Sequence, residues 1–167
     1  MTVIALLLAL TLTPHEQAAM HQLMTTRTFE YPHIGAAGTA SNGFLALRVL
    51  AKSKNADAAF KELVAHAALA GQLYGLMGVS RTDPAFFRTV IEHYKELNEP
   101  VSVENGCMIM SEQVAIIVHD HRAVRLPAGT TLTQWLAANP KTPAFVDIAG
   151  GGLTSLFLDA PEPDETP

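Results

Sequence analysis

The most constraining feature of the sequence is a helical repeat of apolar residues that begins after Asn55. Six apolar residues recur there at intervals of three and four: Ala56, Ala59, Phe60, Leu63, Val64 and Ala67. This spacing places all six on one face of an α-helix. The charged residues of the same segment fall on other faces. The repeat therefore predicts a helix that packs through one side.

Three neighbouring segments have the same character. Ser41–Asn42 is a plausible cap for a helix that carries Phe44 to Leu50, and a further helix is predicted over residues 69–77. A fourth helix begins at Asp83–Pro84, because an acid suits the N-cap and proline suits the first helical position. Short connections between such helices are typical of antiparallel hairpins. The predicted fold class is mainly α: stacked helix hairpins like HEAT or armadillo pairs, with a small extended or hairpin element near the C-terminus.

Two glycines lie inside the predicted third helix, four residues apart. A glycine in a helix interior costs up to about 1 kcal/mol relative to alanine. Gly71 and Gly75 therefore need compensation, which a close approach of two helix backbones supplies.

The segments on either side are less regular. Pro14 opens a short predicted helix that ends at Met24, residues 28–31 are β-prone, and the following residues to 40 are expected to form a loop across the helical body. Val101 and Val103 predict a short strand or connector before an Asn105–Gly106 turn. Ser111 is predicted to cap a helix that ends at Val118, although the run 114–118 suits a strand equally well.

Near the C-terminus, Thr131 and Gln134 form a capping box for a helix that ends at Asn139. Residues 145–148 and 153–158 are expected to be extended on either side of three consecutive glycines. Residues 159–167 are acidic and lack large apolar side chains, which predicts a disordered tail. The domain prediction is a signal peptide over residues 1–20, one helical domain over residues 21–158, and this tail.

The N-terminal run Val3–Leu12 has the length of a signal-peptide core and about half the length of a membrane-spanning helix. A stable membrane span is therefore not expected. Export to the periplasm or out of the cell is expected instead. No lysine or arginine precedes the run, and no A-x-A site follows it. The alternative is a buried first element of a cytoplasmic protein.

The charge of the chain excludes one large class of partner. The sequence has 11 Lys and Arg against 16 Asp and Glu, a net charge of −5. Because attraction to phosphates dominates nucleic-acid affinity, no nucleic-acid partner is expected.

A single cysteine, Cys107, excludes an intramolecular disulfide and any site built on several cysteines. No cofactor is predicted.

Three short stretches resemble a group of uncharacterised, often exported bacterial proteins. They read A-G-Q-L-Y-G-L-M-G (70–78), T-D-P-A-F-F (82–87) and N-G-C (105–107). The resemblance covers about residues 41–118 and brings no known activity. It implies an exported helical protein, and it singles out Tyr74 and Cys107 as weak candidates for binding residues. The alternative for both is packing, with a buried ring and an inert buried thiol.

The motifs of common enzymes are absent. H-E-x-x-H needs a histidine at position 19, which is Ala19, and neither a phosphate loop nor a nucleophile elbow is present. The remaining candidates are His119 and His121. In an extended segment, residues two apart point the same way and could share a metal ion, with Asp120 or Glu104 helping. In a helix the two rings diverge, and the pair becomes a solvated helix end.

The sequence therefore leaves the enzyme question open and leans towards no enzyme. The leading hypothesis is a non-catalytic protein-binding module of the bacterial envelope, of inhibitor or immunity type, with a protein partner. One alternative is a small metal-assisted hydrolase that uses His119 and His121. The other is a cytoplasmic helical adaptor. The sequence does not fix an oligomeric state.

Overall fold

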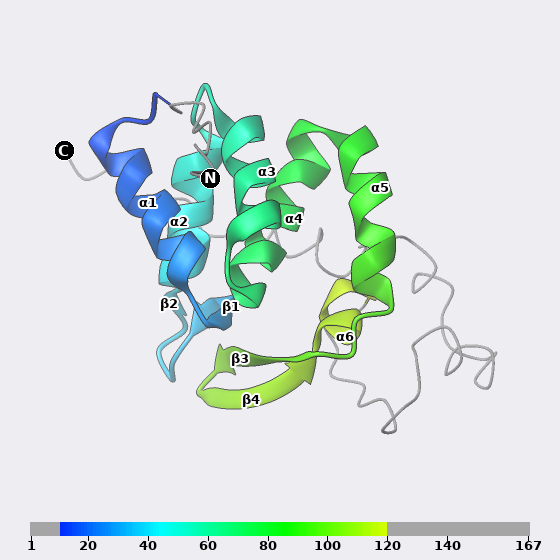
Figure 1. The fold of residues 1–167 in the computed structure, drawn as a ribbon. Coiled ribbons are helices and arrows are strands. Elements are labelled where there is room, and N and C mark those ends of the chain that lie inside the picture. The colour runs from blue at the N-terminus through cyan, green and yellow to red at the C-terminus, as the bar shows by residue number, and fades with distance from the viewer. Residues whose placement is uncertain (1–10, 120–167) are drawn as a thin grey trace, which may run out of the picture.

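The structure, a computed structural model, describes residues 11–119. In this part of the chain six helices and four strands follow one another (Figure 1). The helices are α1 (Pro14–Thr25), α2 (Asn42–Ala51), α3 (Ala56–His66), α4 (Leu69–Thr82), α5 (Pro84–Lys95) and α6 (Val114–His119). The strands are β1 (Thr28–Ile34), β2 (Thr39–Ala40), β3 (Pro100–Gly106) and β4 (Met108–Gln113).

The prediction of a mainly α, all-α fold of HEAT- or armadillo-like hairpins is wrong. The described residues are 59% helix and 20% strand, and the strands form one mixed sheet in the order β2-β1-β3-β4. The fold is therefore α/β. At the centre of the sheet β1 runs parallel to β3, with Phe29 beside Val103. Helices α2 to α5 form the crossover between these two strands, which local periodicity cannot reveal.

The four central helices agree with their sequence patterns. The Ser41 hydroxyl accepts a hydrogen bond from the Phe44 N–H at 3.2 Å, and Asp83 accepts one from the Phe86 N–H at 3.0 Å. Both predicted caps are thereby confirmed. Of the six apolar residues in the repeat that predicted α3, five are buried and Val64 is half-buried. Asn55 precedes α3 but makes no side-chain cap.

Helix α1 begins with a capping box that the sequence analysis did not identify. The Glu16 carboxylate accepts from the Thr13 N–H at 2.7 Å, and the Thr13 hydroxyl accepts from the Glu16 N–H at 3.3 Å. The helix then continues to Thr25 and buries Ala19 and Leu23 in the core. A domain boundary between residues 20 and 21 therefore falls inside a packed helix.

The helix predicted over residues 111–118 is right for residues 114–118 and wrong for residues 111–113, and the alternative of a strand over residues 114–118 is wrong. Ser111 does not cap a helix, because it lies in β4 opposite Ser102. Helix α6 begins three residues later at Val114, and its residues 114–118 are buried. The predicted helix over 131–139, the extended segments around the three glycines and the acidic tail lie outside the described residues.

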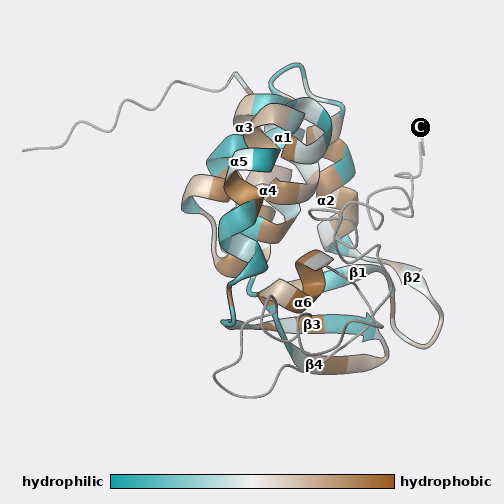
Figure 2. Cartoon of the chain, turned by 90° about the vertical axis from the view of Figure 1, so that its right-hand side faces the viewer, coloured by the Kyte–Doolittle hydropathy of each residue, from teal (hydrophilic) through white to brown (hydrophobic). Residues whose placement is uncertain are grey.

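The core lies between the sheet and the helices, all of which cover the same side of the sheet (Figures 1 and 2). Three aromatic rings meet at its centre. Tyr74 of α4 lies with its ring centroid 5.0 Å from that of Phe29 in β1 and 5.7 Å from that of Phe44 in α2. In the described residues, no helix is both long and apolar enough to span a membrane.

Glycines of α4 stand where other helices approach closely, as predicted. A Cβ atom at Gly71 would collide with the Leu23 carbonyl oxygen of α1. At Gly75 it would lie 2.9 Å from the Val64 backbone nitrogen of α3, and at Gly78 it would collide with the Phe60 ring. Because α4 has neighbours at three successive turns, it is the central helix of the layer.

We expect Gly71→Ala to destabilise the protein by roughly 1 to 3 kcal/mol, because the added methyl group meets backbone rather than a movable side chain. Gly75→Leu should have a similar or larger effect. Chemical denaturation measures the free energy of unfolding. Ala58→Leu, at an exposed position of α3, is the control and should change little. Unchanged stability in both glycine variants would contradict the close packing.

Candidate interaction surface

Two turns from distant parts of the chain meet at one end of the sheet. The first joins β1 to β2 over residues 35–38, and the second joins β3 to β4 at Gly106–Cys107. The Gly35 N–H donates to the Gly106 carbonyl at 2.6 Å, and the two turns lie side by side in both views (Figures 1 and 2). We refer to residues 35–38 and 106–109 together as the hairpin end.

The second turn differs from its prediction by one residue. Asn105 pairs with Met108, so the two loop residues are Gly106 and Cys107. Gly106 has a φ of 57°, and Cys107 does not have a positive φ. Glycine at the first of two loop positions is the pattern of a type II′ turn, whose twist suits a tight hairpin. The Asn105–Gly106 dipeptide therefore marks the turn but does not occupy its centre.

The hairpin end exposes large apolar side chains. Among the described residues, Met108 and Ile109 are the large hydrophobic residues that are exposed, at 60% and 73%. Cys107 and the alanines of the first turn are also exposed. No Asp, Glu, Lys or Arg occurs in residues 31–42 or 105–111. A charge-free apolar cluster on a surface is characteristic of an interaction site.

Strand β4 is an edge strand in the part of the chain that the structure describes. The two-residue turn makes Asn105–Met108 a hydrogen-bonded pair, and such pairs alternate with non-hydrogen-bonded pairs along an antiparallel ladder. Ile109 and Ser111 belong to the second kind. We infer that their backbone N–H and C=O groups point away from β3, where an added strand would find them.

The side chains of β4 alternate between the two faces of the sheet. Met108, Met110 and Glu112 share the helix-covered face with Val103, while Ile109 and Ser111 share the outer face with Glu104. The helices cover this face less and less towards the turn: Glu112 is buried, Met110 is half-buried and Met108 is exposed. The apolar character of the edge is therefore concentrated at its turn end.

Tyr74, the first candidate binding residue, lies in the core. Its hydroxyl accepts from the Glu30 N–H at 2.9 Å and donates to the Glu30 carbonyl at 3.1 Å. Burial is the main cause that raises the pKa of this phenol far above its ordinary value. Both bonding directions of the hydroxyl are used by one strand residue. The packing alternative thus describes Tyr74.

Cys107, the second candidate, lies at the hairpin end with its thiol exposed. The expectation of a small buried hydrophobe is wrong, because the two-residue turn carries this position outward. The structure does not bring Cys107 and Tyr74 together: one is in a surface loop and the other is fully buried.

The two candidate metal ligands are only partly described. His119 is the last residue of α6, whereas Asp120 and His121 lie outside the described residues. Glu104 lies in β3. Within residues 11–119 no group of three or more His, Cys, Asp or Glu side chains is placed to hold a metal ion. The metal site therefore stays a prediction.

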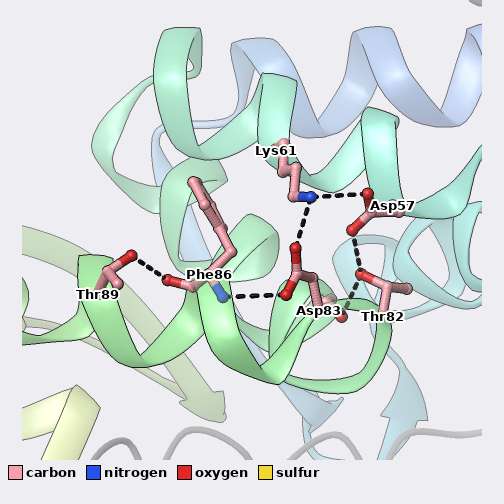
Figure 3. Close-up of polar contacts among 7 residues, drawn as sticks. Asp57, Lys61, Thr82, Asp83, Phe86 and Thr89 are labelled. Atoms are coloured by element: carbon pink, nitrogen blue, oxygen red, sulfur yellow. Dashed lines mark hydrogen bonds and ion pairs between the residues drawn. The ribbon is translucent and has the colours of Figure 1, made fainter.

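One ion cluster links α3 to the start of α5 (Figure 3). The Lys61 ammonium lies 2.8 Å from Asp57 and 2.7 Å from Asp83, and it lies 5.2 Å from the centroid of the Phe86 ring. Hydrogen bonds from Lys61 and from the Phe86 N–H hold the pKa of Asp83 below its usual value. Because its acids and base are already bonded to one another, the cluster has a structural role.

No known protein family, no curated protein and no solved structure matches this chain.

Two features of the structure were missed by sequence reasoning. The first is the exposed Met108–Ile109 pair, whose signal was an apolar run directly after a turn dipeptide. The second is the Glu30 carboxylate, which accepts from the Gly43 N–H at 2.7 Å near the start of α2. No local sequence pattern predicted this bond, because it depends on how closely β1 approaches α2.

We expect Tyr74→Phe to destabilise the protein by about 1 to 3 kcal/mol, the usual cost of leaving buried polar groups without partners. The change removes one hydroxyl that satisfies both backbone groups of Glu30. Tyr94→Phe is a matched control, because the Tyr94 hydroxyl bonds a partly buried Gln72 side chain instead. Denaturation of both variants measures the difference, and an equal effect would contradict the special role of Tyr74.

We expect the ion cluster to lose its contribution in acid. The pKa of Asp83 is lower in the folded protein than its reference value of 3.8, so the contribution is present above that value and disappears as pH falls through the folded pKa. Asp83→Asn keeps an N-cap side chain, because Asn is also a good N-cap, and removes only the negative charge that faces Lys61. The variant should therefore be less stable than the parent at pH 7, and the difference in stability should disappear towards pH 2. A gap independent of pH in thermal denaturation would contradict this.

Proposed function

We propose that this protein is a non-catalytic protein-binding module of the bacterial envelope, and that it binds an extended segment of its partner at the hairpin end. The observation that carries the proposal is the coincidence of an edge strand with the exposed Met108 and Ile109 side chains. An extended segment that adds to a sheet edge gains affinity from backbone hydrogen bonds and specificity from alternate side chains.

The contacts at the hairpin end define the chemistry of the bound segment. On the helix-covered face the segment would contact Met108 and Met110, and on the outer face it would contact Ile109. These three positions favour apolar side chains on both faces of the bound strand. The turns beside them carry no formal charge, so the bound segment needs no charged group to complement them.

The envelope location is supported by the apolar run Val3–Leu12, which has the length of a signal-peptide core.

A specific observation favours the second candidate, a cytoplasmic adaptor. Residues 13–20 would have to supply a cleavage site, but residues 14–20 belong to α1, and Ala19 is buried. Mass spectrometry of the N-terminus of the native protein distinguishes the two locations.

A photo-crosslinking amino acid at Met108, expressed in the native host, tests the binding function. We expect it to capture a defined protein partner, whereas the same group at Arg88, exposed on α5, should not. Purified partner should then bind the Ile109→Asp variant at least tenfold more weakly than the parent, because a charge replaces the central apolar contact. Arg88→Asp is the matched control for this titration.

Binding that is equally sensitive to Arg88→Asp, or insensitive to Ile109→Asp, would place the interface on another surface and overturn the proposal. Circular dichroism of both variants confirms that each is folded. Because Ile109 is 73% exposed, its substitution should leave the core unchanged.

A further inference from the structure

The edge of β4 is complementary to itself. Residues 107–111 read Cys-Met-Ile-Met-Ser, so apolar residues stand symmetrically on either side of Ile109. In an antiparallel pairing about a two-fold axis, each residue contact occurs twice, once in each direction. An axis at Ile109 places that residue beside its own copy and places Met108 beside Met110. The outer pair is Cys107 with Ser111, which is uncharged.

The side chains of β4 select this axis among those that its hydrogen-bond alternation permits. By that alternation the backbone groups of Ile109, Ser111 and Gln113 point away from β3 and can bond an added strand. An axis at Met110 would pair Ile109 with Ser111 and Met108 with Glu112. An axis at Ser111 would pair Ile109 with Gln113 and Met110 with Glu112, and so would set apolar side chains against polar ones. The axis at Ile109 instead joins the exposed apolar residues of the two copies.

Charge does not oppose this pairing. The sequence from Asn105 to Ser111 carries no formal charge. The nearest acid on the outer face is Glu104, opposite Ile109 in β3. Three strand spacings of about 4.8 Å would separate it from its copy by about 14 Å, which exceeds the screening length of about 8 Å at physiological ionic strength.

We propose that β4 pairs antiparallel with β4 of a second copy of this chain, centred on Ile109, to make one continuous eight-stranded sheet from the two four-stranded sheets. This inference rests on the proposed function, because it uses the same edge and names the partner that occupies it. A pairing of about five residues lies at the small end of protein interfaces. The dimer is therefore weak and depends on protein concentration.

Disulfide trapping tests the register directly. In a Cys107→Ser background, Ile109→Cys places two cysteines at the axis, where the Cα atoms of a hydrogen-bonded pair lie about 5.5 Å apart. That separation suits a disulfide. Ser111→Cys in the same background is the matched control, because it is exposed on the same face of β4 but about 14 Å from its copy. We expect Ile109→Cys to form covalent dimer on mild oxidation at least tenfold faster than Ser111→Cys.

Sedimentation of the unmodified chain over a range of concentrations gives the second measurement. We expect a monomer–dimer equilibrium for the parent and for Arg88→Asp, and a monomer for Ile109→Asp. Equal trapping rates for the two cysteine variants would overturn the Ile109-centred pairing. A parent chain that stays monomeric to about 1 mM would overturn self-association.

Failure of this inference is distinguishable from failure of the proposed function. If Met108 crosslinks to a different protein and binding depends on Ile109, the binding function stands while self-pairing is overturned. If the crosslink joins two copies of this chain and trapping occurs at Ile109, both are supported. If neither occurs, both are overturned.

Discussion

The hydroxyl of Tyr74 bonds the helical layer directly to the backbone of the sheet. Strand β2 is only two residues long and pairs with β1 at His33 and Ile34, so it does not reach Glu30. Tyr74 supplies the donor and the acceptor that a neighbouring strand would otherwise offer. The same hydroxyl excludes any side chain at position 43, where a Cβ would collide with it. Glycine there lets α2 approach β1 closely enough for the Glu30 carboxylate to bind its N-terminal turn.

Much of the helical layer could be predicted because its signals are local. The apolar face of α3, the Ser41 and Asp83 caps and the role of Gly71 all follow from spacing and backbone chemistry within one or two helical turns. The structure confirms each of these predictions, because the residues that the sequence pattern marks are the ones that are buried or that cap a helix. Local consistency of this kind is what makes a segment readable from sequence.

The sheet could not be predicted, because its decisive contact joins β1 to β3 across four intervening helices. The β-prone residues 28–31 and the alternation of Val101 and Val103 each indicated a short extended segment. Neither indicated that the two segments are neighbours and parallel. An isolated strand has no stability of its own, so its place is set by tertiary packing. The exposure of Cys107 depends on the register of the turn, which places this residue inside the loop, one position further than the Asn105–Gly106 dipeptide indicates.

The protection of β4 is unequal along its length, and this inequality defines the candidate surface. Edge strands commonly resist pairing by carrying prolines or charges, including charges that point inward. Glu112 is such an inward-pointing acidic residue at the α6 end, where it is buried at 5% exposure. The turn end has neither device, since residues 107–111 contain no proline and no charge. A strand that carries an inward-pointing acid at one end and apolar residues at the other is suited to pairing over a short, fixed register. The contact is then limited to the residues around Ile109.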